Sequence, residues 1–484
     1  MSLEKNNYVD FHCHPALKPY GKSFNYKTIG VNNFNRSRSN SIWHYNPPSI
    51  GDKLLNYIVN LTKFSQANFT SLSKGGVSVI CASLYPIEKP FFDNKLKTEF
   101  LKDMASNFAT GVGKKRVDAI QRMVNYFEDL DREYDFYLQL NNVVFTLPEG
   151  KFKYRIVRNY QDIEAVIEAS KQPSTKITTI CVILSIEGLH VLNSNIELPP
   201  NEDDFLANLK AIKQWDAPPF FVTVAHHFWN HICGHAESFT NLVKSQVDQS
   251  QGLNLGFTAM GVNIINELLS DTNGRRILID VKHMSVASRQ EFYDIIDNTP
   301  AYKNLPIVVS HGAANGLASF KDQTQKGSTV ATKLNPVDIN FFNAELIRIA
   351  KSKGIFGLQL DERRVVNKQT LKDTKSALSR SKIMHYRSEL LWYQMQHIAE
   401  VLDAEGLFAW DCMVIGSDFD GIIDPLNSFW TAEELPFLAD FLERHAYNYL
   451  QKKPFNNPDN NLEADEVISR IMTKNGMRFL KTNF

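Results

Sequence analysis

The most regular feature of this sequence is a series of short apolar segments rich in β-branched residues and bounded by polar or turn-forming residues. Segments of this kind predict β-strands. Eight of them stand out along the chain, at Tyr8–His14, Val77–Tyr85, Ile177–Glu187, Phe220–His226, Ile277–His283, Pro306–His311, Ile355–Leu360 and Met413–Asp418.

Helical patterns lie between most of these segments, for example at Met260–Ser270 and Ala344–Lys353. Alternation of strands with helices predicts a parallel sheet, and continuously apolar strands predict a sheet covered on both faces. Eight such units close a barrel, so we expect an α/β fold of the (β/α)8 TIM type. An open doubly wound sheet is the alternative, but no predicted strand is followed by a GxGxxG turn.

Three segments exceed what a minimal barrel needs, near residues 15–75, 86–176 and 312–342. The second contains a helical pattern at Val117–Leu130. Long loops of a barrel either shape the substrate site or decorate the surface. Without an internal repeat or a linker, we expect residues 1–484 to form a single barrel domain with these insertions.

Most of the predicted strands end in side chains that can bind a metal ion. The carboxyl ends of barrel strands converge on one rim, so residues far apart in the sequence are expected to meet there. The side chains concerned are His12, His14, Glu187, His226, His283, His311 and Asp418.

Each of these residues has an ordinary explanation when it is taken alone. A His-X-His pair at a strand end can be incidental, and Glu187 can form a salt bridge at the rim. His283 and His311 can be hydrogen-bonded core histidines, and Asp418 can cap the next helix. Together, four histidines, a glutamate and an aspartate on one rim favour a site for zinc or a similar divalent metal.

Composition and charge exclude several other classes of protein. Lys+Arg and Asp+Glu both number 53, so no basic excess indicates nucleic acid or a membrane surface. No apolar run approaches the roughly 18 residues of a membrane helix, and the N-terminus does not resemble a signal peptide. Five isolated cysteines without a CxxC pair predict buried, reduced thiols and a cytoplasmic protein.

Five motifs, in this order, resemble the renal (membrane) dipeptidase family of the amidohydrolase superfamily. LIDxxH and GSDFDG together are fairly specific for that family. The motifs are His12-Cys13-His14, Ile186-Glu187-Gly188, Leu278-Ile279-Asp280-Val281-Lys282-His283, Ser310-His311 and Gly416-Ser417-Asp418-Phe419-Asp420-Gly421.

The resemblance implies a centre of two divalent metal ions, which we expect to be zinc. By this resemblance His12 and His14 hold one ion, His283 and His311 hold the other, and Glu187 bridges both. It also implies a small-molecule substrate, a dipeptide or a related amide. Because relatives often form dimers, a homodimer is expected.

The resemblance further assigns catalytic roles to Asp418 and His226. Two metal ions lower the pKa of a shared water from about 15.7 towards roughly 7, and the resulting bridging hydroxide attacks the amide carbonyl. Asp418 then moves the proton to the leaving amine, and His226 stabilises the developing oxyanion.

Two departures from the family pattern concern the metal centre and the substrate. The family usually has an aspartate where this chain has His14. It also carries an arginine for the substrate carboxylate shortly after the strand-six histidine, and none lies between His311 and Asp322. The candidate replacements are Lys321, Arg363 and Arg364. Hydrolysis of a lactone, an N-acyl amino acid or a phosphoester therefore stays open, as does a non-catalytic barrel.

Overall fold

The structure is a computed structural model that describes residues 7–59, 62–92, 110–171, 177–239, 247–374, 379–452 and 454–484. Its central feature is a ring of eight parallel strands, and each predicted apolar segment overlaps one of them. These strands are β1 (Tyr8–Cys13), β2 (Val77–Leu84), β5 (Ile177–Glu187), β6 (Phe221–Thr223), β7 (Leu278–Asp280), β8 (Val308–Gly312), β9 (Ile355–Leu358) and β10 (Met413–Ile415).

The eight strands form a closed barrel rather than an open sheet. They follow the order β2-β1-β10-β9-β8-β7-β6-β5, and β2 also pairs with β5, which joins the two ends of the sheet. Each neighbouring pair in this ring is parallel. The predicted (β/α)8 barrel is therefore confirmed.

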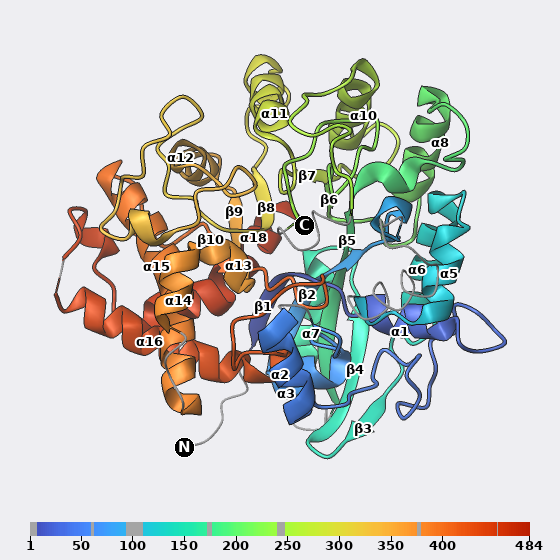
Figure 1. Cartoon of the computed structure of the whole chain (residues 1–484), viewed down its shortest axis with the longest axis horizontal. Coiled ribbons are helices and arrows are strands. Elements are labelled where there is room, and N and C mark those ends of the chain that lie inside the picture. The colour runs from blue at the N-terminus through green and yellow to red at the C-terminus, as the bar shows by residue number, and fades with distance from the viewer. Residues whose placement is uncertain are drawn as a thin grey trace.

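Helices connect the strands and cover the outside of the barrel. Figure 1 shows α10, α11 and α12 along the upper edge of the molecule, with α15 at the left. The predicted helices at Met260–Ser270 and Ala344–Lys353 are confirmed as α10 and α12. The helices that precede β6 to β10 are α8 (Glu202–Lys213), α10 (Ala259–Leu269), α11 (Val286–Asn298), α12 (Asn343–Lys351) and α15 (Arg380–Ala404).

The remaining helices lie in the longer connections and at the end of the chain. They are α1 (Leu17–Ser23), α2 (Ile50–Val59), α3 (Phe69–Lys74), α5 (Lys114–Gln121), α6 (Tyr126–Leu138), α7 (Tyr160–Ser170), α13 (Glu362–Val365), α14 (Lys368–Asp373), α16 (Leu435–Leu450), α17 (Ala464–Ser469) and α18 (Asn475–Asn483). Short 3-10 or π turns are η1 (Lys89–Phe92), η2 (Leu189–Leu192), η3 (Ala331–Lys333), η5 (Ala432–Glu434), η6 (Pro458–Asn460) and η7 (Arg470–Lys474).

Apolar side chains from all eight strands meet inside the barrel. One buried cluster combines Val9, Phe11, Val79, Cys81, Cys181, Ile183, Phe221, Leu278, Val308, Ile355 and Val414 with Phe479 and Leu480 of α18. Side chains on a strand alternate between its two faces, so residues two and four positions further on point into the same interior. By this alternation Ile183 leads to Glu187, and Leu278 leads to Asp280.

The segment 86–176 contains a hairpin that the sequence analysis did not predict. Strands β3 (Phe145–Leu147) and β4 (Gly150–Ile156) pair antiparallel, and β4 runs parallel to the first half of β5. Figure 1 shows the hairpin at the foot of the barrel. Residues 93–109 and 172–176 of this segment lie outside the described residues.

The helical pattern at Val117–Leu130 is confirmed as helix, but it is divided between two helices. Helix α5 ends at Gln121 and α6 begins at Tyr126. The side chain of Asn125 accepts a hydrogen bond from the backbone of Glu128, and this N-cap starts a new helix instead of continuing the first.

The segment 15–75, of which residues 60 and 61 lie outside the described residues, contains α1 to α3 and is fixed to the barrel rim through one aspartate. Asp420, in the turn after β10, accepts hydrogen bonds from Lys18 Nζ at 2.7 Å and from the backbone nitrogens of Gln66 and Ala67 at 3.0 and 2.8 Å. The segment 312–342 consists mostly of turns around η3. The first segment therefore lies next to the rim where β1 and β10 end.

Candidate metal centre

The carboxyl ends of six barrel strands bring all seven predicted site residues together. Each is buried, and each has a ring nitrogen or carboxylate oxygen within 3.9 Å of another member. His12 lies in β1 and His14 directly follows it, Glu187 ends β5, and His311 lies in β8. His226, His283 and Asp418 follow β6, β7 and β10.

Four of the five histidines form two close pairs that both face the carboxylate of Glu187. The pairs are His12 with His14 and His283 with His311. His12 Nε2 lies 3.1 Å from His14 Nε2, and His283 Nε2 lies 3.2 Å from His311 Nε2. Glu187 Oε2 lies 3.0 Å from His14 Nε2 and 3.6 Å from His12 Nε2. Its Oε1 lies 3.3 and 3.4 Å from the Nε2 atoms of His283 and His311. Glu187 thus spans the two pairs with its two oxygens.

Burial and neighbouring charges decide the protonation of this group. Burial lowers the pKa of His12, and it lowers the pKa of His283 and His311 far more. Burial acts the same way on His14, but the hydrogen bond to Glu187 outweighs it, so the pKa of His14 is raised. Burial also works against ionisation of Glu187, yet His226 and His12 hold its pKa well below the usual value.

The donor set fits two divalent cations. Two ring nitrogens that face each other at 3.1 or 3.2 Å cannot both carry a proton, whereas tetrahedral ligands at about 2.0–2.1 Å from zinc stand roughly 3.3 Å apart. Ligand atoms within 4.8 Å of one another define the groups His12, His14, Glu187 and Glu187, His283, His311. These residues could hold two ions with Glu187 between them.

Asp418 lies beside the first pair, in a turn that depends on a glycine. Its Oδ1 is 3.8 Å from the Nε2 atoms of both His12 and His14, and its φ of 59° places it in the left-handed region. A Cβ on Gly421 would lie 2.0 Å from Asp418 Oδ1, so only glycine leaves room for this carboxylate. Burial and the charge of Glu187 raise the pKa of Asp418 well above its usual value.

His226 is oriented by a glutamate that the sequence analysis did not foresee. Its Nδ1 lies 3.1 and 3.0 Å from the two carboxylate oxygens of Glu88, which also accepts hydrogen bonds from Tyr85 Oη and the His227 backbone. The opposite nitrogen, Nε2, lies 3.6 Å from Glu187 Oε1. Burial lowers the pKa of His226, but the charges of Glu88 and Glu187 outweigh this and raise it.

The hydroxyl of the buried residue Ser310 lies within hydrogen-bond distance of one histidine of each pair. Ser310 Oγ donates to Asp280 Oδ2 at 2.6 Å, so its oxygen is left to accept from ring nitrogens. His12 Nδ1 and His311 Nδ1 lie 3.2 and 2.9 Å from it. Both rings are therefore held with the proton on Nδ1 and with the Nε2 lone pair directed at Glu187. Thr223 Oγ1 also donates to Asp280, at 2.7 Å.

The three cations proposed as replacements for the missing arginine lie in different surroundings. Lys321 is exposed, and Arg363 donates from Nε and Nη2 to both carboxylate oxygens of Asp361. Arg364 donates to the carbonyl oxygen of Ser238 and makes no ion pair with a described residue.

A fourth cation, Lys282, was not among those candidates. It is 1% exposed, and within the described part of the chain its Nζ has no hydrogen-bond partner. Burial, followed by the charge of Arg364, lowers the pKa of Lys282 to about 7.

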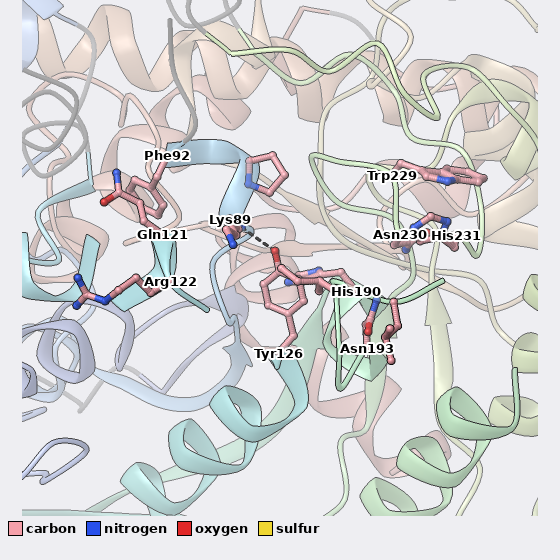
Figure 2. Close-up of a pocket in the computed structure, with 13 residues that line it drawn as sticks. Lys89, Phe92, Gln121, Arg122, Tyr126, His190, Asn193, Trp229, Asn230 and His231 are labelled. Carbon is pink, nitrogen blue, oxygen red and sulfur yellow. Dashed lines mark hydrogen bonds between the residues drawn. The ribbon is translucent and has the colours of Figure 1, made fainter. Parts of the chain in front are cut away.

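A pocket of about 680 Å³ is lined by other residues than the seven of the centre (Figure 2). Lys89, Tyr126 and Trp229 are among the side chains that surround it, and the Lys89 backbone donates to Tyr126 Oη at 2.7 Å. His190 belongs to this wall, and a Cβ on Gly188 would lie 2.5 Å from its Nδ1. The described residues that line the pocket include two cations and no carboxylate.

A β/α barrel with histidines and carboxylates gathered at its carboxyl rim defines the class of metal-dependent hydrolases. Within that class, residues 44–453 match the family model of membrane dipeptidase, peptidase family M19. The chain belongs to this family and is a dipeptidase-like metallohydrolase. The predicted family is confirmed, although the match begins after His12 and His14.

Comparison with solved structures supports the same fold. A metallopeptidase described as dipeptidase AC has a TM-score of 0.51 and 13% identity, covering 99% of both chains. A metallopeptidase from Rhodobacter sphaeroides has a TM-score of 0.51 and 11% identity, covering 99% of this chain and 100% of its own. No curated protein sequence matches this one. No helix in the described residues is long and apolar enough to span a membrane.

Proposed function

We propose that this protein hydrolyses the amide bond of a dipeptide at a centre of two divalent ions, with zinc as the native metal. His12 and His14 would hold one ion, His283 and His311 would hold the other, and Glu187, which faces both pairs, would complete the donor set. The observation that carries this proposal is the position of Glu187, whose two oxygens each face one histidine pair.

Metal ions at this centre supply an activated water and polarise the substrate carbonyl. Asp418 lies beside the first pair, and its raised pKa suits a group that takes a proton and gives it to the leaving amine. Glu88 holds the Nδ1 proton of His226, which leaves Nε2 pointing into the site. When protonated, that nitrogen donates a hydrogen bond to the oxyanion that develops on the carbonyl.

The substrate class is supported by the family and by one of the solved relatives. The Rhodobacter sphaeroides metallopeptidase is liganded with a phosphinate mimic of the dipeptide L-Ala-D-Ala. A tetrahedral phosphinate resembles the state reached when water adds to an amide carbonyl. We therefore expect free dipeptides, and phosphinate mimics as inhibitors, to be recognised by this chain.

The proposal is tested by measuring metal content and dipeptide hydrolysis on the full chain. Wild type is expected to bind up to two equivalents of zinc and to lose hydrolysis with a chelator. His283→Ala is expected to lose metal from the second pair together with activity. Asp418→Asn is expected to keep its metal while turnover falls about 100-fold or more. Full metal content and full activity in His283→Ala would refute the assignment.

Hydrolysis of an N-acyl amino acid or a lactone is the second candidate function, favoured by the absence of arginine between His311 and Asp322. A panel of dipeptides, N-acetyl amino acids and lactones at equal concentration separates the candidates. Preference for a substrate without a free α-amino group would favour the second.

A further inference from the structure

Lys282 places a buried amino group at the metal centre without giving it a partner. The residue lies in the turn that follows β7, two positions after Asp280 and directly before His283, and its side chain is 1% exposed. Its charge acts on His226 and on His283 and His311 of the second pair, so its amino group lies on that side of the centre.

A buried ammonium without a counter-ion is costly, because burial removes its hydration and nothing replaces it. Lysines are rarely buried unless they are paired. Asp418, Asp280 and Glu187 are close enough to act on Lys282, but none accepts a hydrogen bond from its Nζ. The three N–H donors of this group are therefore open to an acceptor that comes from outside the chain.

Arg364 supplies a second positive charge at the same place. It follows β9 on the same rim, and its charge is among the strongest that act on Lys282. The charges of Asp361 and Asp418 in turn act on Arg364. Arg363 is bound to both carboxylate oxygens of Asp361, whereas Arg364 donates to the carbonyl oxygen of Ser238 and forms no ion pair with a described residue.

The size of a dipeptide explains why a cation is needed so close to the metal ligands. The α-carboxylate of the second residue follows the scissile carbonyl by one residue, a distance of about 3.8 Å at most. A group that binds this carboxylate must therefore lie within the centre itself. Lys282, adjacent to His283, satisfies that condition, whereas the exposed Lys321 does not.

We propose that Lys282 and Arg364 together bind the α-carboxylate of the substrate's second residue, in place of the arginine that this chain lacks after His311. The inference rests on the proposed dipeptidase function. It makes Lys282 and Arg364 the residues that select substrates with a free carboxyl end.

The experiment compares two phosphinate dipeptide mimics, one with a free carboxylate and one with a carboxamide in its place. Their binding to the metal-loaded full chain is measured by calorimetry for wild type, Lys282→Met, Arg364→Met and the control Lys321→Met. Lys282→Met replaces a buried charge with an apolar side chain of similar length, so the fold is expected to survive.

Wild type and Lys321→Met are expected to bind the carboxylate mimic at least 10-fold more tightly than the carboxamide. Lys282→Met and Arg364→Met are each expected to reduce this preference by about 10- to 100-fold, as for loss of a charge-assisted hydrogen bond. Metal content should remain that of wild type.

An equal preference in wild type and both variants overturns the inference, and so does a wild type that binds the two mimics equally or not at all. The proposed function is decided separately by dipeptide hydrolysis with the same wild-type preparation. A protein that binds the carboxylate mimic selectively but cleaves no dipeptide would refute the function and leave the carboxylate site standing.

Discussion

Replacing Ser310 by alanine tests whether one hydroxyl supports both metal ions. The side chain lies under the centre, where His12 Nδ1 and His311 Nδ1 are 3.2 and 2.9 Å from its Oγ. Each of these histidines belongs to a different pair. The variant removes the acceptor that holds both imidazoles with the proton on Nδ1, without removing any metal ligand.

The expected loss of metal affinity follows from the number of hydrogen bonds that the variant removes. Loss of one hydrogen bond behind a metal-bound histidine typically lowers metal affinity 10- to 100-fold. Because Ser310 serves one histidine of each pair, we expect this loss at both ions, or about 1.4–2.7 kcal/mol for each. Ser310→Ala also removes a hydrogen bond to the buried carboxylate of Asp280, which is worth about 1.5–3 kcal/mol of folding free energy.

Thr223→Val is the matched control, because Thr223 donates to the same oxygen of Asp280 but forms no hydrogen bond with an imidazole of the described residues. Both variants are expected to lower the free energy of unfolding of the metal-free protein by similar amounts, measured by urea denaturation. Only Ser310→Ala is expected to lose zinc at lower chelator concentrations in a competition titration. Equal zinc affinity in the two variants would refute the reasoning.

Two further predictions concern a glycine and a buried histidine. Gly421→Ala places a Cβ 2.0 Å from Asp418 Oδ1 and should lower kcat at least about 10-fold. Gly51→Ala is the control, because the nearest contact of its added Cβ is 3.6 Å away and kcat should not change. Equal kcat values in the two variants would contradict this prediction. Burial lowers the pKa of His397 to about 4, below its unfolded value of 6.5, so its contribution to stability is complete above pH 6.5 and is lost as pH falls towards 4. This loss amounts to about 3 kcal/mol of unfolding free energy. Urea denaturation from pH 7 to pH 4 should show that the unfolding free energy of His397→Gln depends less on pH than that of wild type. Parallel curves would contradict this prediction.

The barrel could be predicted because its strands are buried on both faces. A continuously apolar segment such as Ile177–Glu187 has few competing interpretations, and in the structure β5 has these same bounds. The hairpin at Phe145–Ile156 has the alternating pattern of a half-exposed strand, with Phe152, Tyr154 and Ile156 buried. That signal was present in the sequence, but it lay in a segment interpreted only by its helical patterns.

The convergence of the site residues could be predicted because barrel geometry gives each strand end a known place. His12 and Glu187 meet for that reason, although 175 positions separate them in the sequence. Their roles as ligands stay predictions, as do the homodimer and the single-domain assignment. Glu88 could not be predicted in the same way, because it follows β2 in a connection whose path depends on tertiary packing.

Lys282 was missed although the pattern contained it. The segment Ile277–His283 was interpreted as an apolar strand with a terminal histidine, but the strand ends at Asp280 and Lys282 lies in the buried turn that follows it. Alternation along β7 accounts for the buried Leu278 and Asp280, whereas the burial of Lys282 depends on the path of this turn. The Asp280 carboxylate accepts a hydrogen bond from Ser310 Oγ, which also lies within hydrogen-bond distance of His12 Nδ1. Its charge acts on Lys282, but its oxygens accept side-chain hydrogen bonds from Ser310 and Thr223 and none from the Lys282 ammonium, which is therefore the group that we propose to bind an anionic substrate.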